Sequence, residues 1–526
     1  MTRPYSERQE ACNPWVDRVS LSVQNELALT EREVEVRNKG VSVRNLARVL
    51  IATGAVIALS LGTTTAHAAN PYPNIANDTV WLDNSGNEIK AQGGSILKVG
   101  STYYWTGTEM NGGSYGFDAV NLYKSTNLQD WTFVKRILAP TGTGDLAAGK
   151  WVGRADLVYN PSTATYIVVV EVESGGAGPG NKIGFASSST VEGTYTYAGS
   201  TLVNGLTVGD HSVYVEGNNA WITYDGDSSS KRNVTLGIAP LGPTWMTVGT
   251  PIFSQANSGR EATFIMKVGS TYHWFASGMD WWNSTATQHN VGSSLTSWGS
   301  WSTVATTPAS TNSFNSQFDF VLPITGSGGT SYIYGGDRYT NMAASGNPAP
   351  TGFGRNAWYE LTFSGTTPTI RGYTDMAVDL TTGTITGNYV ANGRFDQAVA
   401  GQTAPLWNES LTASAGLTQT GGVVNNKLTH IAKKTYKANT YQTISLPNGT
   451  YTFSAKVMSS GGQTTAALQL KSHGGGDITI PVTASASWVT ISQVFTVTTG
   501  TVQVAVWSES PGNKWLSVDD IAIWKN

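Results

Sequence analysis

The sequence predicts an all-β protein, a five-bladed β-propeller followed by a β-sandwich of the jelly-roll type. Two observations predict the propeller and one the sandwich. The octapeptide KVGSTYYW at residues 98–105 returns as KVGSTYHW at residues 267–274. The composition, with 59 Gly, 22 Tyr and 18 Trp among 526 residues, favours short strands joined by tight turns. After residue 386 the repeat stops, and longer strands with period-two alternation follow.

The amino-terminal segment, residues 1–69, is predicted to direct secretion. Two arginines precede an apolar run at residues 49–62, which is too short to span a bilayer and is followed by an Ala-X-Ala cleavage pattern at residues 66–68. The mature, extracellular chain is therefore expected to start near Ala69. The residues before about position 41 fit either a start codon assigned too early or an unusually long signal sequence.

The charge and cysteine content exclude several classes of function. The net charge of −3 and the absence of a basic run argue against binding to nucleic acid or to an anionic membrane. The only cysteine, Cys12, lies before the predicted cleavage site, so the mature chain is expected to have no disulfide. No group of His, Cys or acidic residues has the spacing of a metal site. A monomer that binds a polar, uncharged ligand fits these features.

Five segments share one pattern, an apolar strand, a turn containing Gly, Asn or Pro, and a second strand rich in aromatic residues. They are GGSILKVGSTYYWTG from Gly93, RADLVYNPSTATYIVVVE from Arg154, DHSVYVEGNNAWITYDGD from Asp210, REATFIMKVGSTYHWFASG from Arg260, and QFDFVLPITGSGGTSYIYGGD from Gln317. Further short strands lie between them, which makes four strands per repeat. Five such repeats predict a five-bladed propeller over residues 70–386, in which the octapeptide forms the same inner hairpin in the first and fourth blades.

The starts of the inner strands carry the polar residues that are expected to face the central channel. They are Gln92 and Gly93, Arg154 and Asp156, Asp210 and His211, Arg260 and Glu261, and Gln317 and Asp319. Cleavage of a glycosidic bond needs one acid to protonate the leaving oxygen and a second group to activate water. Glu261 could be that acid, and Asp210 could raise its pKa. The alternative is that these charges only bind each other, above all through Arg154 and Arg260. His211 is expected to be a hydrogen-bonding residue.

Several motifs in this region resemble those of glycoside hydrolase family 43, and most of all those of its exo-β-1,3-galactanases. In chain order they are IKAQGG with KVGSTYYWTG, VGRADLVYNP, GDHSVY, REATFIMKVGSTYHW, SGMDWWN, SQFDFVLP and YGGDR. The resemblance implies that Glu261 is the general acid, Asp210 its supporting acid, and Gln317 the residue at the base position. It implies a sugar-stacking role for Trp282. The other residues expected to bind substrate are Gln92, Glu109, Arg154, Asp156, Asp319 and Asp337.

Two positions depart from the pattern of the galactanases. Gly153-Arg154-Ala155 stands where they usually have Glu-Arg-Pro, and Gln92 stands where they prefer His. Asp156 is expected to compensate for the missing carboxylate, because a residue two positions after Arg154 lies on the same face of a regular strand. The exact substrate stays open.

The role of Gln317 has two interpretations. A neutral amide accepts a proton only as its imidic acid tautomer, which the family resemblance suggests. Alternatively, Gln317 holds the water or a sugar hydroxyl while Asp156 or Asp319 accepts the proton.

The second part, residues 387–526, is predicted to be a carbohydrate-binding module. Its opening NGRFD and closing VDDIAIW resemble modules of the family 4, 9 and 22 group. Such a module holds an enzyme near its polysaccharide. The candidate stacking residues are Trp407, Tyr436, Tyr441, Trp507 and Trp515, each of which could instead pack in the core. Asp396, Asp519 and Asp520 are either ligands of a structural calcium ion or surface charges, and no other cofactor is expected.

Together these features predict a secreted, inverting, exo-acting hydrolase of β-1,3-galactan, the backbone of type II arabinogalactan. The alternatives are an arabinofuranosidase or xylosidase of the same family, and a carbohydrate-binding propeller without catalysis.

Overall fold

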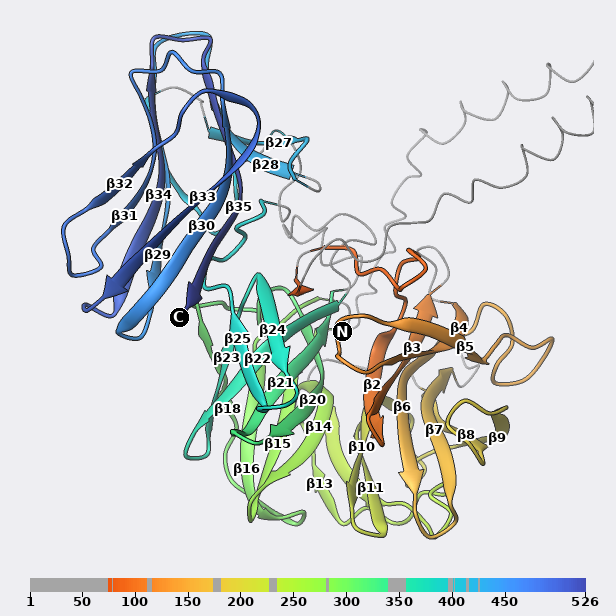
Figure 1. Ribbon diagram of the computed structural model, residues 1–526. Helices are drawn as coiled ribbons and strands as arrows, with labels where there is room; N and C mark the ends of the chain where they lie inside the picture. The colour runs from red at the N-terminus through yellow and green to blue at the C-terminus, as the bar shows by residue number, and fades with distance from the viewer. Residues whose placement is uncertain are drawn as a thin grey trace, which may run out of the picture. The chain divides into compact units, whose positions relative to one another are not determined.

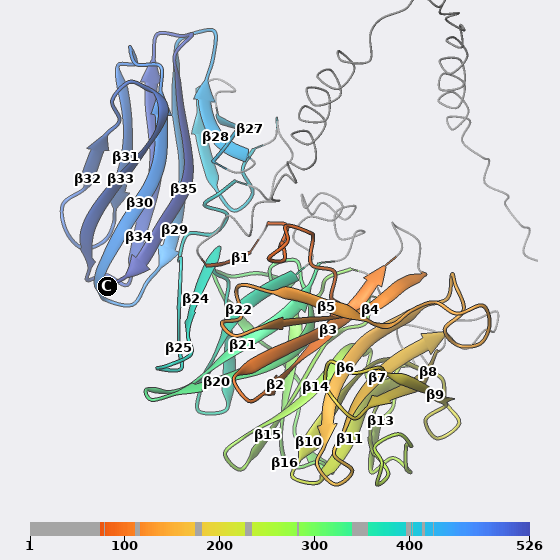
Figure 2. The ribbon, with the colours of Figure 1, turned by 45° about the vertical axis from the view of Figure 1, so that its right-hand side comes forward.

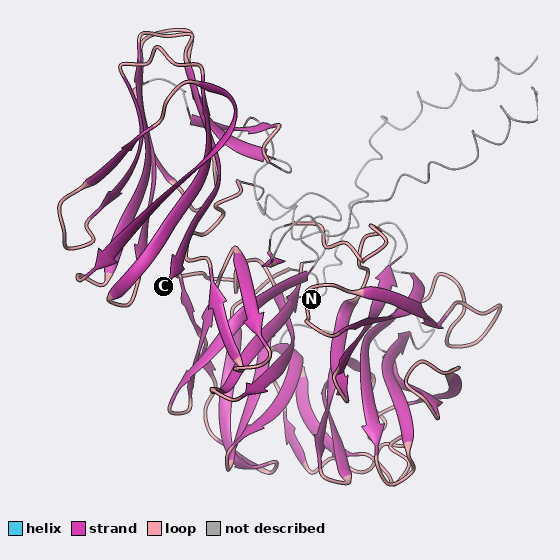
Figure 3. Cartoon of the chain, viewed as in Figure 1, coloured by secondary structure: helices cyan, strands magenta, loops and turns pink. Residues whose placement is uncertain are grey.

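The computed structural model describes residues 74–526, except residues 78, 111–115, 174–180, 227–233, 281–282, 339–355, 396–400, 402, 413–415 and 424–425. Strands and turns account for the described residues, as the all-β prediction expects (Figure 3). Within this part of the chain no helix has the length and apolarity needed to cross a membrane. The predicted signal segment lies outside the described residues.

Five groups of mostly antiparallel strands form the blades of a propeller, and the fold predicted from the repeats is confirmed (Figure 1). Blades two and three are joined in one eight-stranded sheet through the pairing of Val208 with Asn181. Blade one contains β2 (Gln92–Val99), β3 (Thr102–Met110), β4 (Phe117–Ser125) and β5 (Thr132–Leu138). Blade two contains β6 (Val152–Asn160), β7 (Thr165–Glu173), β8 (Asn181–Ser188) and β9 (Thr196–Thr201). Blade three contains β10 (Val208–Glu216), β11 (Asn219–Gly226), β12 (Thr235–Pro240) and β13 (Phe253–Gln255). Blade four contains β14 (Arg260–Val268), β15 (Thr271–Gly278), β16 (Thr287–Ser294), β17 (Ser297–Trp298) and β18 (Ser302–Thr303). Blade five contains β20 (Gln317–Gly326), β21 (Gly329–Asp337), β22 (Asn356–Ser364), β23 (Thr367–Arg371) and β19 (Ala305–Thr307), which pairs in parallel with β23.

The repeated octapeptide forms the inner hairpins β2–β3 and β14–β15. The turn glycines Gly100 and Gly269 have φ angles of 62° and 60°, a conformation that glycine adopts without steric cost. Trp105 and Trp274, which end the two copies, are both buried in hydrophobic clusters beside their hairpins. The octapeptide therefore recurs because two blades need the same turn and the same buried indole.

The first and fifth blades meet at a cluster of tryptophans. The rings of Trp81 and Trp105 both lie 5.0 Å from that of Trp358 in blade five. The side chain of Asn77 donates to the carbonyl of Trp358 at 2.6 Å and accepts from its backbone N–H at 2.9 Å. Nearby, β1 (Ile75–Ala76), β24 (Asp375–Asp379) and β25 (Thr384–Gly387) form a small sheet. Aromatic packing and backbone hydrogen bonds thus close the ring.

The carboxy-terminal strands form two five-stranded antiparallel sheets, whose face-to-face packing is visible in Figure 2. One sheet has the order β26 (Asn408–Leu411), β29 (Tyr436–Ser445), β34 (Thr501–Ser510), β31 (Thr465–Lys471), β32 (Ile478–Pro481). The other has the order β27 (Gly416–Thr420), β28 (Asn426–Ile431), β35 (Trp515–Lys525), β30 (Gly449–Ser459), β33 (Ser485–Val497). Their apolar faces share one core that includes Phe453, Val504 and Ile523. The predicted β-sandwich is confirmed.

Candidate active site

The five inner strands, β2, β6, β10, β14 and β20, surround the middle of the propeller in both ribbon views (Figures 1 and 2). Each of them has a break in its pairing register near its start. Gly93, Arg154 and Ala262 have φ angles of 56°, 46° and 53° at three of these breaks. A β-bulge changes the direction of side chains and is common beside active sites. These bulges bring the polar residues at the strand starts together.

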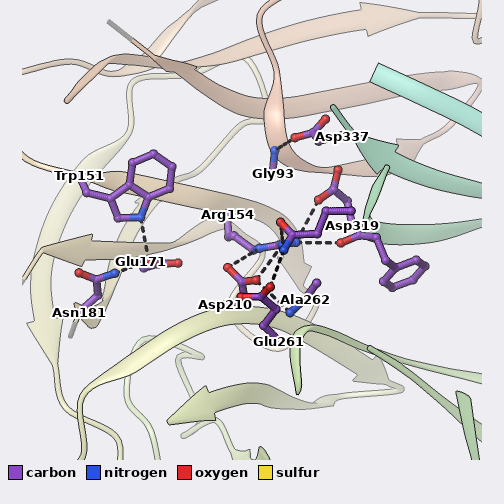
Figure 4. A network of polar contacts seen from close by, with 12 residues as sticks. Gly93, Trp151, Arg154, Glu171, Asn181, Asp210, Glu261, Ala262, Asp319 and Asp337 are labelled. Carbon is purple, nitrogen blue, oxygen red and sulfur yellow. Dashed lines mark hydrogen bonds and ion pairs between the residues drawn. The ribbon is translucent and has the colours of Figure 1, made fainter. Parts of the chain in front are cut away.

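Arg154 is the centre of the resulting network (Figure 4). Its Nε lies 2.7 Å from Asp210 Oδ1, and its Nη2 donates to Asp210 Oδ2 at 2.9 Å. Its Nη1 donates to Asp319 Oδ1 at 3.0 Å. The side chain of Arg154 is only 6% exposed, and that of Asp319 is 3% exposed. A planar guanidinium can hold several carboxylates at fixed angles, so Arg154 sets the positions of acids from the third and fifth blades.

Glu261 and Gln317 contact each other directly beside this arginine. Gln317 Nε2 donates to Glu261 Oε1 at 3.0 Å, and Gln317 Oε1 accepts from Arg154 Nη2 at 3.1 Å. Glu261 Oε1 also accepts the backbone N–H of Asp280 at 2.8 Å. Burial first, and then the charge of Asp210, raise the pKa of Glu261 well above its ordinary value. Both causes favour the protonated form of Glu261.

The structure adds Asp225 to the network, a residue that the sequence analysis did not single out. Three carboxyl oxygens, one from each of Asp210, Asp225 and Glu261, lie within 4.8 Å of one another. Oxygens at this spacing could hold a cation. Burial, followed by the charges of Asp210, Glu261 and Glu171, raises the pKa of Asp225. Gly209 makes room for it, because a Cβ there would lie 2.2 Å from Asp225 Oδ1.

A second missed residue is Glu171 in β7. It is 95% buried and accepts hydrogen bonds from Trp151 and Asn181 (Figure 4). Both Glu171 and Asp225 lie near the end of the second strand of an inner hairpin, across from a strand start. The same is true of Asp337 in YGGD, which was predicted. Attention to the strand ends VVVEVE and ITYDGD would have found them.

Asp337 and Gln92 lie where blades one and five meet this network. The Asp337 carboxylate accepts the backbone N–H of Gly93, which follows Gln92 in the bulge of β2. Burial, followed by the charge of Asp337, raises the pKa of Asp319. Gln92 is buried, and its Oε1 has no hydrogen-bond partner.

Asp156 does not lie where regular alternation placed it. The bulge between Gly153 and Asp156, with Arg154 at a positive φ, breaks the period-two pattern that put Arg154 and Asp156 on one face. Asp156 Oδ2 instead accepts the N–H of Val213 from β10 at 2.7 Å, and its side chain is hydrogen-bonded to Ser95 in β2. The premise that Asp156 shares a face with Arg154 is therefore wrong, and its carboxylate joins three blades.

The other predicted propeller residues have different surroundings. Glu109 forms ion pairs with Lys90 at 2.8 Å and Arg136 at 3.1 Å. His211 is buried, and burial lowers its pKa to about 4, so that it is neutral. Trp282 lies outside the described residues.

The aromatic candidates of the sandwich fall into two groups. Trp407 packs in the core and donates its indole N–H to Asn392 O at 3.1 Å. Tyr436 is likewise buried. Tyr441 and Trp507 are half-buried on β29 and β34, alternating with core residues such as Val504 and Val506, and Trp515 is half-buried at the start of β35.

The candidate calcium ligands have protein partners. Asp519 Oδ2 accepts the N–H of Val423 at 2.6 Å, and Asp520 lies 3.3 Å from Arg394. Asp396 lies outside the described residues. The calcium site stays a prediction.

A five-bladed propeller with a buried glutamate of raised pKa, a second carboxylate beside it and an arginine that binds this carboxylate has the features of a propeller glycoside hydrolase. The family model "Glycosyl hydrolases family 43" matches residues 88–357, and the chain belongs to this family.

Solved structures of exo-β-1,3-galactanases are similar to this chain. One from Phanerochaete chrysosporium, in complex with β-1,3-galactotriose, has 23% sequence identity and a TM-score of 0.57, with 86% of this chain and 100% of that one covered. One from Clostridium thermocellum has 19% identity and a TM-score of 0.54, with 83% and 99% covered. At this identity the likeness shows the fold. No curated protein sequence matches.

Proposed function

We propose that the protein is a secreted, exo-acting, inverting hydrolase that removes galactose from β-1,3-galactan. The observation that carries the proposal is the contact set of Glu261, a buried carboxyl of raised pKa that accepts hydrogen bonds from Gln317 and from the N–H of Asp280 beside the charge of Asp210. Such an acid can protonate a glycosidic oxygen. The galactotriose complex of a structurally similar galactanase supports the choice of sugar.

In this proposal Glu261 protonates the leaving oxygen, and Asp210 keeps Glu261 protonated until the sugar is bound. An inverting enzyme needs room for sugar and water between its acid and its base, with a separation of about 6.5–9.5 Å. Since Gln317 contacts Glu261 directly, the sugar has to enter between them and break that hydrogen bond. Gln317 then positions the attacking water.

The proton of that water is proposed to pass to Asp319, which has to be ionised for this step; the charge of Arg154, 3.0 Å away, favours the ionised form and opposes the effect of burial. The Oε1 of Gln317 accepts from a guanidinium, which cannot itself accept a proton, and this contact favours the ordinary amide over the imidic acid. Asp319 is held by the other terminal nitrogen of the same guanidinium. Asp156 is engaged between blades and is the less suitable base.

The sandwich is proposed to bind the polysaccharide through the outer face of the β29–β34 sheet. Tyr441 and Trp507 are on that face, and the oxygens Asn439 Oδ1 and Gln469 Oε1, from β29 and β31, are buried without a hydrogen-bond partner. Aromatic rings beside amide groups suit the stacking and hydrogen bonding of sugars. The mature protein is proposed to act as a monomer.

The test is product analysis of residues 69–526 on β-1,3-galactan and arabinogalactan, with p-nitrophenyl arabinofuranoside and xyloside as controls. Release of galactose, alone or carrying a side chain, is the expected result. Release of arabinose or xylose without galactose would indicate an arabinofuranosidase or a xylosidase of the same family. Sugar binding without any release would mean a propeller that has lost catalysis.

A further inference from the structure

Glu171 is a buried carboxyl near the channel to which the proposed mechanism gives no role. Glu171 Oε1 accepts the indole N–H of Trp151 at 2.7 Å and an amide N–H of Asn181. Its other oxygen, Oε2, is buried and has no hydrogen-bond partner. A buried polar atom without a partner costs free energy, so such an atom calls for a reason. Two donors thus fix this side chain in one orientation and leave Oε2 unused.

The chain is built locally to keep this arrangement. Glu171 pairs across the hairpin with Gly153, the second residue of β6. A Cβ at Gly153 would lie 2.2 Å from Cζ2 of Trp151, so the indole occupies the space that a side chain at position 153 would need. The absence of a side chain at Gly153 therefore allows Trp151 to reach and orient Glu171.

Glu171 faces the charged groups of the proposed active site. Besides burial, the charges of Asp210 and Arg154 both shift the pKa of Glu171, Asp210 upward and Arg154 downward. In addition to burial, the charge of Glu171 in turn raises the pKa of Asp225. Figure 4 shows Glu171 between Asn181 and Trp151 on one side and Asp210 with Arg154 on the other. Its unpartnered oxygen is thus beside the carboxylates that surround the proposed glycosidic bond.

We propose that Glu171 is a substrate-binding residue, whose Oε2 forms a hydrogen bond with one hydroxyl group of the galactosyl unit held beside Glu261. This inference rests on the proposed function and extends it with a specificity-determining contact. Trp151 and Asn181 act as positioning residues, since they orient Glu171 without themselves contacting the sugar.

Glu171 binds the hydroxyl as a neutral acid. Burial first, and then the charge of Asp210, raise the pKa of Glu171 to about 8, while Arg154 opposes this shift. Asp225 is the other acid that faces it. At pH 6 the carboxyl therefore carries its proton, which it can donate to a sugar oxygen. A glutamine side chain would imitate this form, because its amide N–H₂ replaces the O–H.

The first test compares Glu171→Ala with Glu171→Gln at pH 6 on β-1,3-galactobiose. Loss of a hydrogen bond in a buried site should lower kcat/KM of the alanine variant about tenfold to hundredfold. The glutamine variant should stay within about threefold of the wild type, because it keeps a donor at this position. Glu192→Gln is the matched control, since Glu192 lies in the same blade but is a partly exposed partner of Lys124. Wild-type activity in the alanine variant would overturn the inference.

The second test uses galactobioses that lack one hydroxyl of the non-reducing galactose. For one of them, the wild type and Glu171→Ala should have equal kcat/KM, because the contact is already missing. If Glu171→Ala lowers kcat/KM by the same factor for every sugar, the role of Glu171 is merely structural and the inference is overturned. Wild-type protein that releases no galactose from any galactan would overturn the proposed function itself. An active wild type with an unaffected alanine variant would overturn this inference alone.

Discussion

Gln317 donates its amide N–H to Glu261 Oε1 at 3.0 Å, so the residue at the expected base position holds the acid directly. This contact exists because the bulges in β14 and β20 direct two strand starts toward each other. In the proposed mechanism this contact couples substrate binding to the activation of water, since the sugar would have to separate the two side chains.

Glu261→Gln should abolish hydrolysis. The amide cannot protonate the leaving oxygen, and general acid catalysis contributes about 10²–10⁴ in rate. Galactose release from β-1,3-galactan should fall by at least that range, while binding of galactotriose, measured by calorimetry, should stay within a few fold. Substantial residual release would show that another group is the acid.

Asp210→Asn should move the alkaline limb of the pH profile of kcat/KM to lower pH. The charge of Asp210 raises the pKa of Glu261, so its removal lowers that pKa, and the protonated acid is lost earlier as pH rises. Initial rates between pH 4 and 9 would measure the shift, with Glu192→Gln as control. An unchanged alkaline limb would contradict the assignment of Asp210 as the group that tunes Glu261.

Asp156→Asn should reduce the pH dependence of stability while leaving catalysis largely intact. Burial raises the pKa of Asp156 to about 7, well above the ordinary value of an aspartate. The folded state therefore binds the proton more tightly than the unfolded state. The proton on Asp156 stabilises the folded state fully below about pH 4, and this stabilisation is lost between about pH 4 and 7 at no more than about 1.4 kcal/mol per pH unit. Urea unfolding at several pH values measures the slope, which should be smaller in the variant. A large loss of kcat would instead favour Asp156 as the base.

Gly153→Ala should destabilise the protein, because the new methyl group would lie 2.2 Å from the indole of Trp151. Overpacking in a buried site costs about 1–3 kcal/mol. Gly142→Ala is the control, since a Cβ there meets nothing within 4 Å, and its free energy of unfolding should be unchanged or slightly higher. Equal stability of both variants would show that Trp151 moves aside without cost.

Trp507→Ala should weaken binding to insoluble β-1,3-galactan without lowering the melting temperature, because Trp507 is half-buried on an outer sheet face. Trp407→Ala should lower the melting temperature, because Trp407 packs in the core, where loss of a large aromatic costs about 3–5 kcal/mol. A pull-down assay and thermal unfolding separate the two effects. Undiminished binding by the Trp507 variant would show that the sugar binds to another face of the sandwich.

The sequence by itself determined the blade pattern and the strand starts that meet in the channel. The repeated octapeptide, its turn glycines and its tryptophans predict two matching hairpins. The strand starts of the repeats predict a set of neighbouring residues, namely Arg154, Asp210, Glu261, Gln317 and Asp319. Local turn chemistry and repeat spacing carry this information, because each depends on residues close together in the chain.

Only the tertiary structure decided which side chains face the channel. Period-two alternation predicts Asp156 on the same face as Arg154. The bulge at Arg154 instead directs the Asp156 carboxylate toward the next blade, where it accepts the N–H of Val213. Asp225 and Glu171 enter the network from the second strand of their hairpins. A bulge depends on the partner strand and on the packing of adjacent blades, so no single-strand periodicity encodes it.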